Sequence, residues 1–154
     1  MIITNCRTGG SITGKVTGSG NRNLLAGGII GDVGLAPGAG DSQNEKIVIN
    51  NCYSTMKIEL TNESSSQKRF ITAGGVVGYY SNNKDSTEIS NSVALNPVIT
   101  VVKGGASDVH AHRVIGFRSG NGTMKNNYAL STMKVDENTI SGRRSGRFRR
   151  CEHN

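Results

Sequence analysis

Three side chains that can ligate metals alternate along one short segment of the chain. Asp108, His110 and His112 are each separated by one residue, and alternate residues of an extended strand lie on the same side of it. Such a set is typical of a transition-metal site, but the sequence does not indicate which further histidine would complete it. We therefore expect no metal ion and no other cofactor, and we retain His110, His112 and the adjoining Arg113 as candidate binding residues.

A glycine-rich segment comes close to a phosphate-binding loop. Residues 9–16 read Gly-Gly-Ser-Ile-Thr-Gly-Lys-Val, one residue short of that motif, with Val16 where the motif has a Mg²⁺-binding Ser or Thr. The motif also requires the N-terminus of a helix to follow it, whereas residues 17–21 have the composition of a turn. We expect no nucleotide here, with Ile12 in the core and Lys15 in solvent.

The sequence does not predict catalytic residues. It contains no Gly-x-Ser-x-Gly motif and no evident pair of cysteine and histidine. The acids outside the repeated motifs fall mainly in segments of loop composition: Asp32, Asp41, Glu45, Asp85 and Asp108. The alternative is a fragment of a β-helix polysaccharide-degrading enzyme, which would gather charged side chains on one sheet. Only His110, His112 and Arg113 lie near one another in the chain.

Two short motifs recur along the chain and must position all of these residues. The first has an aliphatic residue or Met two positions before an Asn, and its copies are residues 3–8, 49–54, 89–94 and 124–129. The second is Ala-Gly-Gly-aliphatic-aliphatic-Gly, at residues 26–31 and 73–78, with Ala-His-Arg-Val-Ile-Gly at residues 111–116. The fourth copy lacks a Gly-Gly block, so its coil is expected to be incomplete.

Alignment on the repeated Asn, at spacings of 46, 40 and 35 residues, gives columns of similar side chains. If each copy is one coil, the members of a column stack about 4.8 Å apart. The columns expected to fill the interior are Ile3, Ile49, Ile89 and Met124, and Ile12, Ile58, Val98 and Met133. The small corner column is Thr8, Ser54, Ala94 and Ala129, and the outer column is Arg7, Tyr53, Val93 and Tyr128. The exposed Arg7, Tyr53 and Tyr128 are candidate binding residues, because an aromatic surface suits sugar rings or a protein partner.

Composition agrees with turn-rich β structure. Of the 154 residues, 34% are hydrophobic and 21 are Gly, while Trp is absent, which favours a thin aliphatic core between many turns. We expect an all-β fold, a β-solenoid of about three to four irregular coils over residues 1–140. The net charge of +7 is concentrated in residues 141–154, which we expect to be an Arg-rich disordered tail. Its alternative role is nucleic-acid binding, which we do not favour.

Two of the three cysteines occupy one column. Cys6 and Cys52 would stack directly, yet in-register parallel strands place their Cβ atoms side by side and strain a disulfide. We expect free thiols that serve as small core residues. Cys151 lies in the tail, without an evident partner.

The pairing of Asn51-Cys52-Tyr53-Ser54 with the motif at residues 73–78 resembles the GLUG-type repeats of bacterial cell-surface and adhesin-like proteins. The resemblance covers residues 1 to about 135 and departs from the pattern at His112 and Arg113. It implies a right-handed parallel β-helix displayed outside a bacterial cell. It carries over no catalytic residues.

These observations lead to an expected role. We expect a non-catalytic structural or interaction module of a bacterial surface or secreted adhesin-like protein, which binds a glycan or a host or cell-surface protein. No segment reaches the ~18 apolar residues of a membrane span, so we expect no membrane insertion. We expect the chain to be a piece of a longer protein whose signal and anchor lie elsewhere, with self-association through uncapped solenoid ends as a further possibility.

Overall fold

A computed structural model of the 154-residue chain describes residues 1–18, 23–34, 46–63, 70–82, 87–104 and 108–135. Within these ranges the regular elements are all β-strands, and there is no helix. None of the described residues therefore forms a helix long and apolar enough to cross a membrane. Every strand pairing is parallel, and the strands form five sheets, here called A to E in the order in which the chain visits them.

The strands recur in the same order in each coil. Sheet A contains β1 (Ile2–Thr4), β6 (Ile47–Asn50), β11 (Thr87–Ser90) and β16 (Thr123–Lys125). Sheet B contains β2 (Arg7–Thr8), β7 (Tyr53–Ser54), β12 (Val93–Ala94) and β17 (Tyr128–Ala129). Sheet C contains β3 (Ser11–Val16), β8 (Lys57–Asn62), β13 (Val98–Val102) and β18 (Lys134–Val135). Sheet D contains β4 (Leu24–Gly27), β9 (Phe70–Gly74) and β14 (Asp108–His112), and sheet E contains β5 (Ile30–Gly34), β10 (Val77–Asn82) and β15 (Ile115–Gly120).

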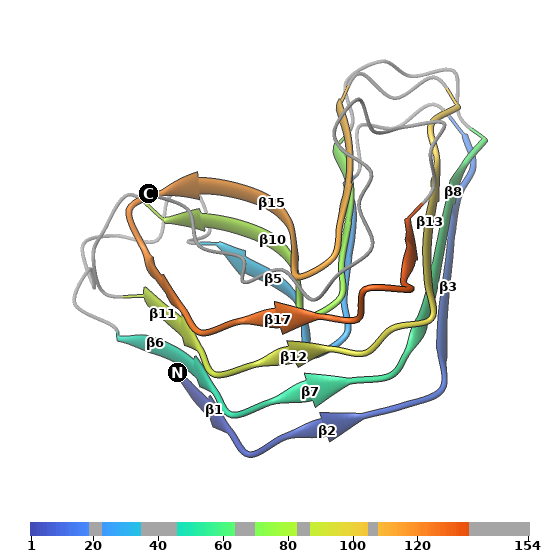
Figure 1. The fold of residues 1–154 in the computed structure, drawn as a ribbon. Coiled ribbons are helices and arrows are strands. Elements are labelled where there is room, and N and C mark those ends of the chain that lie inside the picture. Colours follow the sequence, from blue (N-terminus) through green and yellow to red (C-terminus); the bar gives the residue numbers. More distant parts are fainter. Residues whose placement is uncertain (19–22, 35–45, 64–69, 83–86, 105–107, 136–154) are drawn as a thin grey trace.

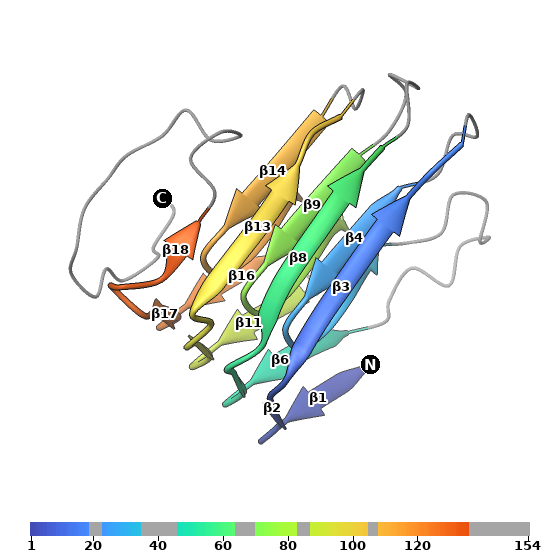
Figure 2. The ribbon, with the colours of Figure 1, turned by 90° about the vertical axis from the view of Figure 1, so that its right-hand side faces the viewer.

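The chain is a parallel β-solenoid. Coils 1 to 3 contribute one strand to every sheet, and the described part of coil 4 contributes to sheets A, B and C alone. In Figure 1 each coil runs counterclockwise, and comparison with Figure 2 shows that successive coils advance toward the viewer of Figure 1. The solenoid is therefore right-handed, as the resemblance implied and as parallel crossovers normally are. The expected all-β solenoid of three to four coils is confirmed.

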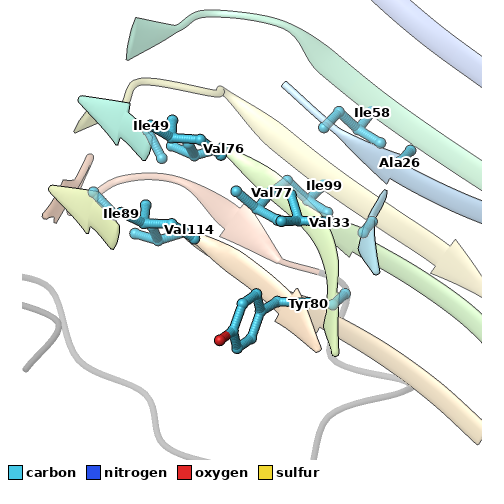
Figure 3. Close-up of a cluster of buried hydrophobic side chains, with 14 of the residues drawn as sticks. Ala26, Val33, Ile49, Ile58, Val76, Val77, Tyr80, Ile89, Ile99 and Val114 are labelled. Atoms are coloured by element: carbon cyan, nitrogen blue, oxygen red, sulfur yellow. The ribbon is translucent and has the colours of Figure 1, made fainter. Parts of the chain in front are cut away.

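The cross-section has two thin arms rather than a round lumen (Figure 1). Sheet D packs against sheet C in one arm, and sheet E lies over sheets A and B in the other. One continuous apolar core fills both arms. Figure 3 shows Ile49 near Val76 and Ile89 near Val114, so the same aliphatic contact recurs in successive coils. Each such residue is almost completely buried and contributes roughly 1.5–3 kcal/mol through removal of its side chain from water.

The predicted columns are confirmed in sheets A and B and partly wrong in sheet C. Ile3, Ile49, Ile89 and Met124 are in register. In sheet C, however, Ile58 pairs with Ile99 rather than with Val98, and Ile99 pairs with Val135 rather than with Met133. The segment between sheets B and C is longer by one residue in coil 3 and by two in coil 4, so counting from the Asn misplaced this column.

A single Asn turns the chain from sheet A into sheet B in every coil. Asn5, Asn51, Asn91 and Asn126 all have positive φ, between 50° and 56°, a left-handed conformation that Asn tolerates better than other side-chain-bearing residues. Their amides form a ladder in two steps: Nδ2 of Asn51 donates to Oδ1 of Asn5 at 2.6 Å, and Nδ2 of Asn126 donates to Oδ1 of Asn91 at 3.2 Å. Between these steps Asn91 donates to Oδ1 of Asn50, at a longer 3.5 Å.

The column after this Asn is an internal polar ladder. The backbone N–H of Cys52 donates to the Ser92 hydroxyl at 3.3 Å, and the N–H of Ser92 donates to Oδ1 of Asn127 at 3.1 Å. Nδ2 of Asn127 in turn donates to the carbonyl of Ile89 at 2.7 Å. Buried polar groups at this corner are thus satisfied from one coil to the next.

The glycine-rich segment at residues 9–16 forms part of sheet C. Its strand β3 pairs with β8 from Ser11 to Val16, so no helix follows the glycines as a phosphate loop requires. Ile12 packs against the core. Lys15 makes a solvent-exposed ion pair with Glu63 at 2.7 Å, which contributes little to stability.

The residues outside the described ranges fall at two junctions and at the C-terminal end of the chain. Residues 19–22, 64–69 and 105–107 connect sheet C to sheet D, and residues 35–45 and 83–86 connect sheet E to sheet A. Residues 136–154, with Cys151 and the Arg-rich tail, also lie outside the described residues. The boundary expected at residue 140 therefore stays a prediction.

Candidate functional site

The outer column of sheet B has the predicted register. Arg7 pairs with Tyr53, Tyr53 with Val93, and Val93 with Tyr128. Arg7 and Tyr128 are exposed and Tyr53 is half-buried, and the guanidinium carbon of Arg7 lies 5.9 Å from the centre of the Tyr53 ring. That distance is at the limit of a cation–π contact. Because Val93 separates the two tyrosines by two coil spacings, about 9.6 Å, they do not form a continuous aromatic surface.

The two predicted histidines lie on one face of β14. Their ring centroids are 6.4 Å apart, with an angle of 21° between the rings. Arg113 directly follows β14, in the bend between sheets D and E. Among the described residues, no group of three His, Cys, Asp or Glu side chains is placed to hold a metal ion. The structure thus brings His110 and His112 together on sheet D. The other predicted binding residues, Arg7, Tyr53 and Tyr128, lie on sheet B.

Three aromatic residues that the sequence patterns did not single out gather beside His110. Ring centroids of Tyr79 and Phe117 are 5.2 Å apart and nearly parallel, and Phe70 lies 6.3 Å from Tyr79 and 6.2 Å from Phe117. The ring of His110 lies 4.8 Å from that of Phe117. All four side chains are half-buried. We call Phe70, Tyr79, His110 and Phe117 the elbow cluster.

Strand alternation places the elbow cluster on the outside of the solenoid. Ile71 and Ala111 have no exposed surface and belong to the core, so their neighbours Phe70 and His110 point to the opposite side of sheet D. Tyr80 is likewise a core residue of sheet E, so its neighbour Tyr79 points outward. Phe117 pairs with Tyr79 in register and shares its face.

The outer faces of sheets D and E meet at a re-entrant angle, which brings the four rings together (Figure 1). The bend is closed by a hydrogen bond in which the buried Thr72 hydroxyl donates to the carbonyl of Gly78 at 2.9 Å. Phe70 is also held by coil 1, because its backbone N–H donates to Oδ1 of Asn23 at 3.1 Å. The rings are therefore carried by paired strands and not by the connecting segments.

Two carboxylates flank the elbow cluster. Asp32 pairs with Tyr79 in sheet E, and Asp108 pairs with Phe70 in sheet D. Both residues belong to strands, although the local composition predicted loops for them. The other three acids of that prediction, Asp41, Glu45 and Asp85, lie outside the described residues. Asp32 is an exposed residue overall, yet loss of solvation raises the pKa of its carboxyl, and a hydrogen bond from the Gly34 backbone opposes that shift. The surface thus combines apolar ring faces with hydrogen-bond acceptors.

A sequence signal for the elbow cluster exists in the second motif. The residue directly after its last Gly is Asp32, Tyr79 or Phe117 in the three coils, and these form one column. Alignment on the first motif alone did not include that position. The contact between this column and sheet D also depends on the angle between the sheets, which no periodicity of the sequence reports.

Both cysteines of the described chain are free thiols, as expected. Cys52 is 1% exposed, and its Sγ lies 3.2 Å from the carbonyl oxygen of Asn50. Burial raises the pKa of the Cys52 thiol, and a hydrogen bond from the Cys6 backbone opposes that shift in part. A protonated thiol in the core is a packing group and not a nucleophile.

No protein-family model, curated protein or solved structure matches the chain.

Proposed function

We propose that this chain is a non-catalytic interaction module of a bacterial surface or secreted adhesin-like protein, and that it binds a glycan at the elbow cluster. The observation that carries the proposal is the gathering of four half-buried rings from four paired strands on one outer surface. The resemblance of the repeats to GLUG-type surface proteins supports the bacterial surface as the location.

The chemistry of the elbow cluster favours a sugar over an extended apolar partner. Aromatic rings pack against the C–H faces of a pyranose and keep their edges for other contacts. The carboxylates of Asp32 and Asp108, at either side of the rings, accept hydrogen bonds from hydroxyl groups. A flat apolar partner would remove water from both carboxylates without offering them hydrogen-bond donors, and that desolvation opposes binding.

Rigidity of the surface supports the same proposal. The side chains of Phe70 and Tyr79 are fixed by mutual contact and by strand pairing, so little side-chain entropy is lost when a ligand is bound. The outer column of sheet B offers a smaller preformed aromatic surface, since its two tyrosines are separated by Val93. Sheet B is therefore the second-ranked surface, and it provides matched control residues.

The test is a screen of the purified chain on an array of bacterial and host glycans, followed by calorimetric titration of the strongest binder. Tyr79→Ala and Phe117→Ala should each weaken binding about tenfold, since a ring contact of this kind is worth roughly 1 kcal/mol or more. Tyr53→Ala and Tyr128→Ala remove the same type of side chain from sheet B and should leave binding unchanged. Thermal melts of all four variants separate loss of binding from loss of fold.

Three outcomes would contradict the proposal in different ways. A silent array, with wild-type chain that is folded, removes glycan binding. Loss of binding in the sheet B variants alone keeps a glycan module but moves its site to sheet B. Release of soluble sugar from the bound polysaccharide during incubation would make the protein an enzyme and overturn its assignment as non-catalytic.

A further inference from the structure

At the bend between sheets D and E, the next coil occupies the space into which a side chain of the preceding coil would point. Gly28 of coil 1 and Gly75 of coil 2 are the second glycines of the repeated Gly-Gly pair. A Cβ added at Gly28 would overlap the carbonyl oxygen of Gly75, and one added at Gly75 would overlap the carbonyl oxygen of Arg113. At Gly75 the added atom would also lie 2.6 Å from Cβ of Ala94 in coil 3.

The requirement for glycine at these positions is steric. Neither Gly28 nor Gly75 is among the residues with positive φ, so the backbone conformation itself accepts any L-amino acid. The obstacle is the following coil: the backbone of its D–E bend, and side chains near its sheet B, which are Ser54 above Gly28 and Ala94 and Asn96 above Gly75. The backbone cannot move without loss of the strand pairing on both sides of the bend. The first glycines, Gly27 and Gly74, are restricted from two directions. An added Cβ would overlap a carbonyl oxygen of their own coil, that of Ile30 or Val77, and it would also overlap the backbone nitrogen of Gly78 or Gly116 in the next coil.

Coil 3 has side chains at both of these positions. His112 pairs in register with Gly74, and Arg113 directly follows it, as Gly75 follows Gly74. In the part of the chain that the structure describes, sheets D and E have no strand beyond β14 and β15, although sheets A, B and C continue into coil 4. The glycine pair is thus replaced in the one coil whose bend has no described coil stacked on it.

We propose that His112 and Arg113 act as a stop that closes sheets D and E to any further coil. Their Cβ atoms occupy the space that the backbone of a fourth D–E bend needs. Sheets A, B and C accept coil 4 in register, so the stop acts on the D–E bend alone. The stop applies equally to a coil of the same chain and to a coil offered by a second copy, and it does not depend on the proposed glycan binding.

Coil duplication tests the stop in the full chain. Residues 51–90 form one coil of 40 residues that ends at Ser90, and residues 91–125 form one coil of 35 that ends at Lys125. One variant carries a second copy of residues 51–90 after Ser90, so that only Gly-Gly bends lie beneath other coils. A second variant carries a copy of residues 91–125 after Lys125, which places a His112-Arg113 bend beneath a complete coil. Two derivatives of the second variant change only that inner pair, to Gly-Gly or to Ala-Ala.

The melting temperatures of the four chains, followed by circular dichroism, decide the matter. The duplicate with the inner His112-Arg113 pair should melt roughly 5–10 °C below its Gly-Gly derivative, because overpacking of this kind costs stability and a chain of this size responds by a few degrees per kcal/mol. The Ala-Ala derivative should melt near the His-Arg duplicate, since alanine keeps the offending Cβ while it removes the ring and the charge.

Each result either supports or overturns the proposal. Failure of the His-Arg duplicate to fold, together with a folded Gly-Gly derivative, is the strongest support. Equal melting temperatures of the His-Arg and Gly-Gly duplicates would refute it, as would an Ala-Ala derivative as stable as Gly-Gly. If the Gly-Gly derivative fails to fold while the duplicate of residues 51–90 folds, the pair is not what ends the sheets.

Discussion

The corner Asn residues allow a prediction whose magnitude follows from two separable terms. Asn51 has a φ of 54°, and a left-handed conformation costs roughly 1–2 kcal/mol for a side chain that does not favour it. Its Nδ2 also donates to Oδ1 of Asn5 at 2.6 Å, a net contribution of about 0.5–1 kcal/mol at an exposed position. Asn51→Ala incurs the conformational cost and loses the hydrogen bond, and we expect it to lower the free energy of unfolding by about 1.5–3 kcal/mol.

Asn51→Gly loses only the amide contact. Glycine adopts positive φ without steric cost, so this variant should lose no more than about 1 kcal/mol and should be more stable than Asn51→Ala. A glycine variant that is more stable than the alanine variant is thus the result that identifies a left-handed backbone at this corner. Lys57 supplies the control, because it is an exposed residue of strand β8, where glycine weakens an extended strand and the order should reverse.

Urea unfolding followed by far-ultraviolet circular dichroism measures these differences, provided that the m-value is the same in all variants. A gap of 1 kcal/mol corresponds to about 2–4 °C in melting temperature for a chain of this size. If Asn51→Gly is as unstable as Asn51→Ala, the left-handed backbone is not what selects Asn at these corners. If both variants equal the wild type, neither the conformation nor the amide ladder contributes.

Three further predictions concern the interior. Gly75→Ala should lower the free energy of unfolding by about 3 kcal/mol in urea titrations, because the new methyl group meets backbone of coil 3; a loss below about 1 kcal/mol would show that the coils can separate there. Ile99→Ala, at a residue with no exposed surface, should cost about 2–5 kcal/mol, whereas Ile2→Ala, at a residue 71% exposed, should cost under about 0.5 kcal/mol. Cys52 should react with a thiol reagent far more slowly than Cys6, because it is buried and its pKa is raised; equal rates would contradict this. Its contribution to stability should be complete below the pKa of the unfolded thiol, about 8.5, and should decline as pH rises through the raised pKa, a slope that Cys52→Ala removes.

The repeat was sufficient to predict the solenoid and most of its columns. The Asn spacing placed Ile49, Ile89 and the outer pair Tyr53 and Val93 in their observed register, because one left-handed residue fixes where each coil turns. It failed at Val98, since the corner between sheets B and C has a residue of positive φ in coil 1, Gly10, but none in coils 2 to 4, and it admits extra length. Ile99 takes the core position instead.

The elbow cluster could not be predicted from the columns alone. A column reports which residues stack along the axis, and Tyr79 over Phe117 is such a pair. It does not report which two sheets face each other across the outside of a coil. Phe70 meets Tyr79 only because sheet E turns back from sheet D at a re-entrant angle, and that angle is set by packing within both arms.

The two junctions of variable length give the solenoid a property that a round globule lacks. Sheet C ends and sheet D begins at the same end of one arm in successive coils (Figure 2), and the strands on both sides stay in register although the connecting segments differ in length. A peptide grafted into any of these connections would leave every interior column untouched. Grafts in adjacent coils would be held about 4.8 Å apart, in a fixed order, along one edge. The chain could therefore serve as a scaffold that displays several short sequences side by side, at a spacing set by the backbone alone.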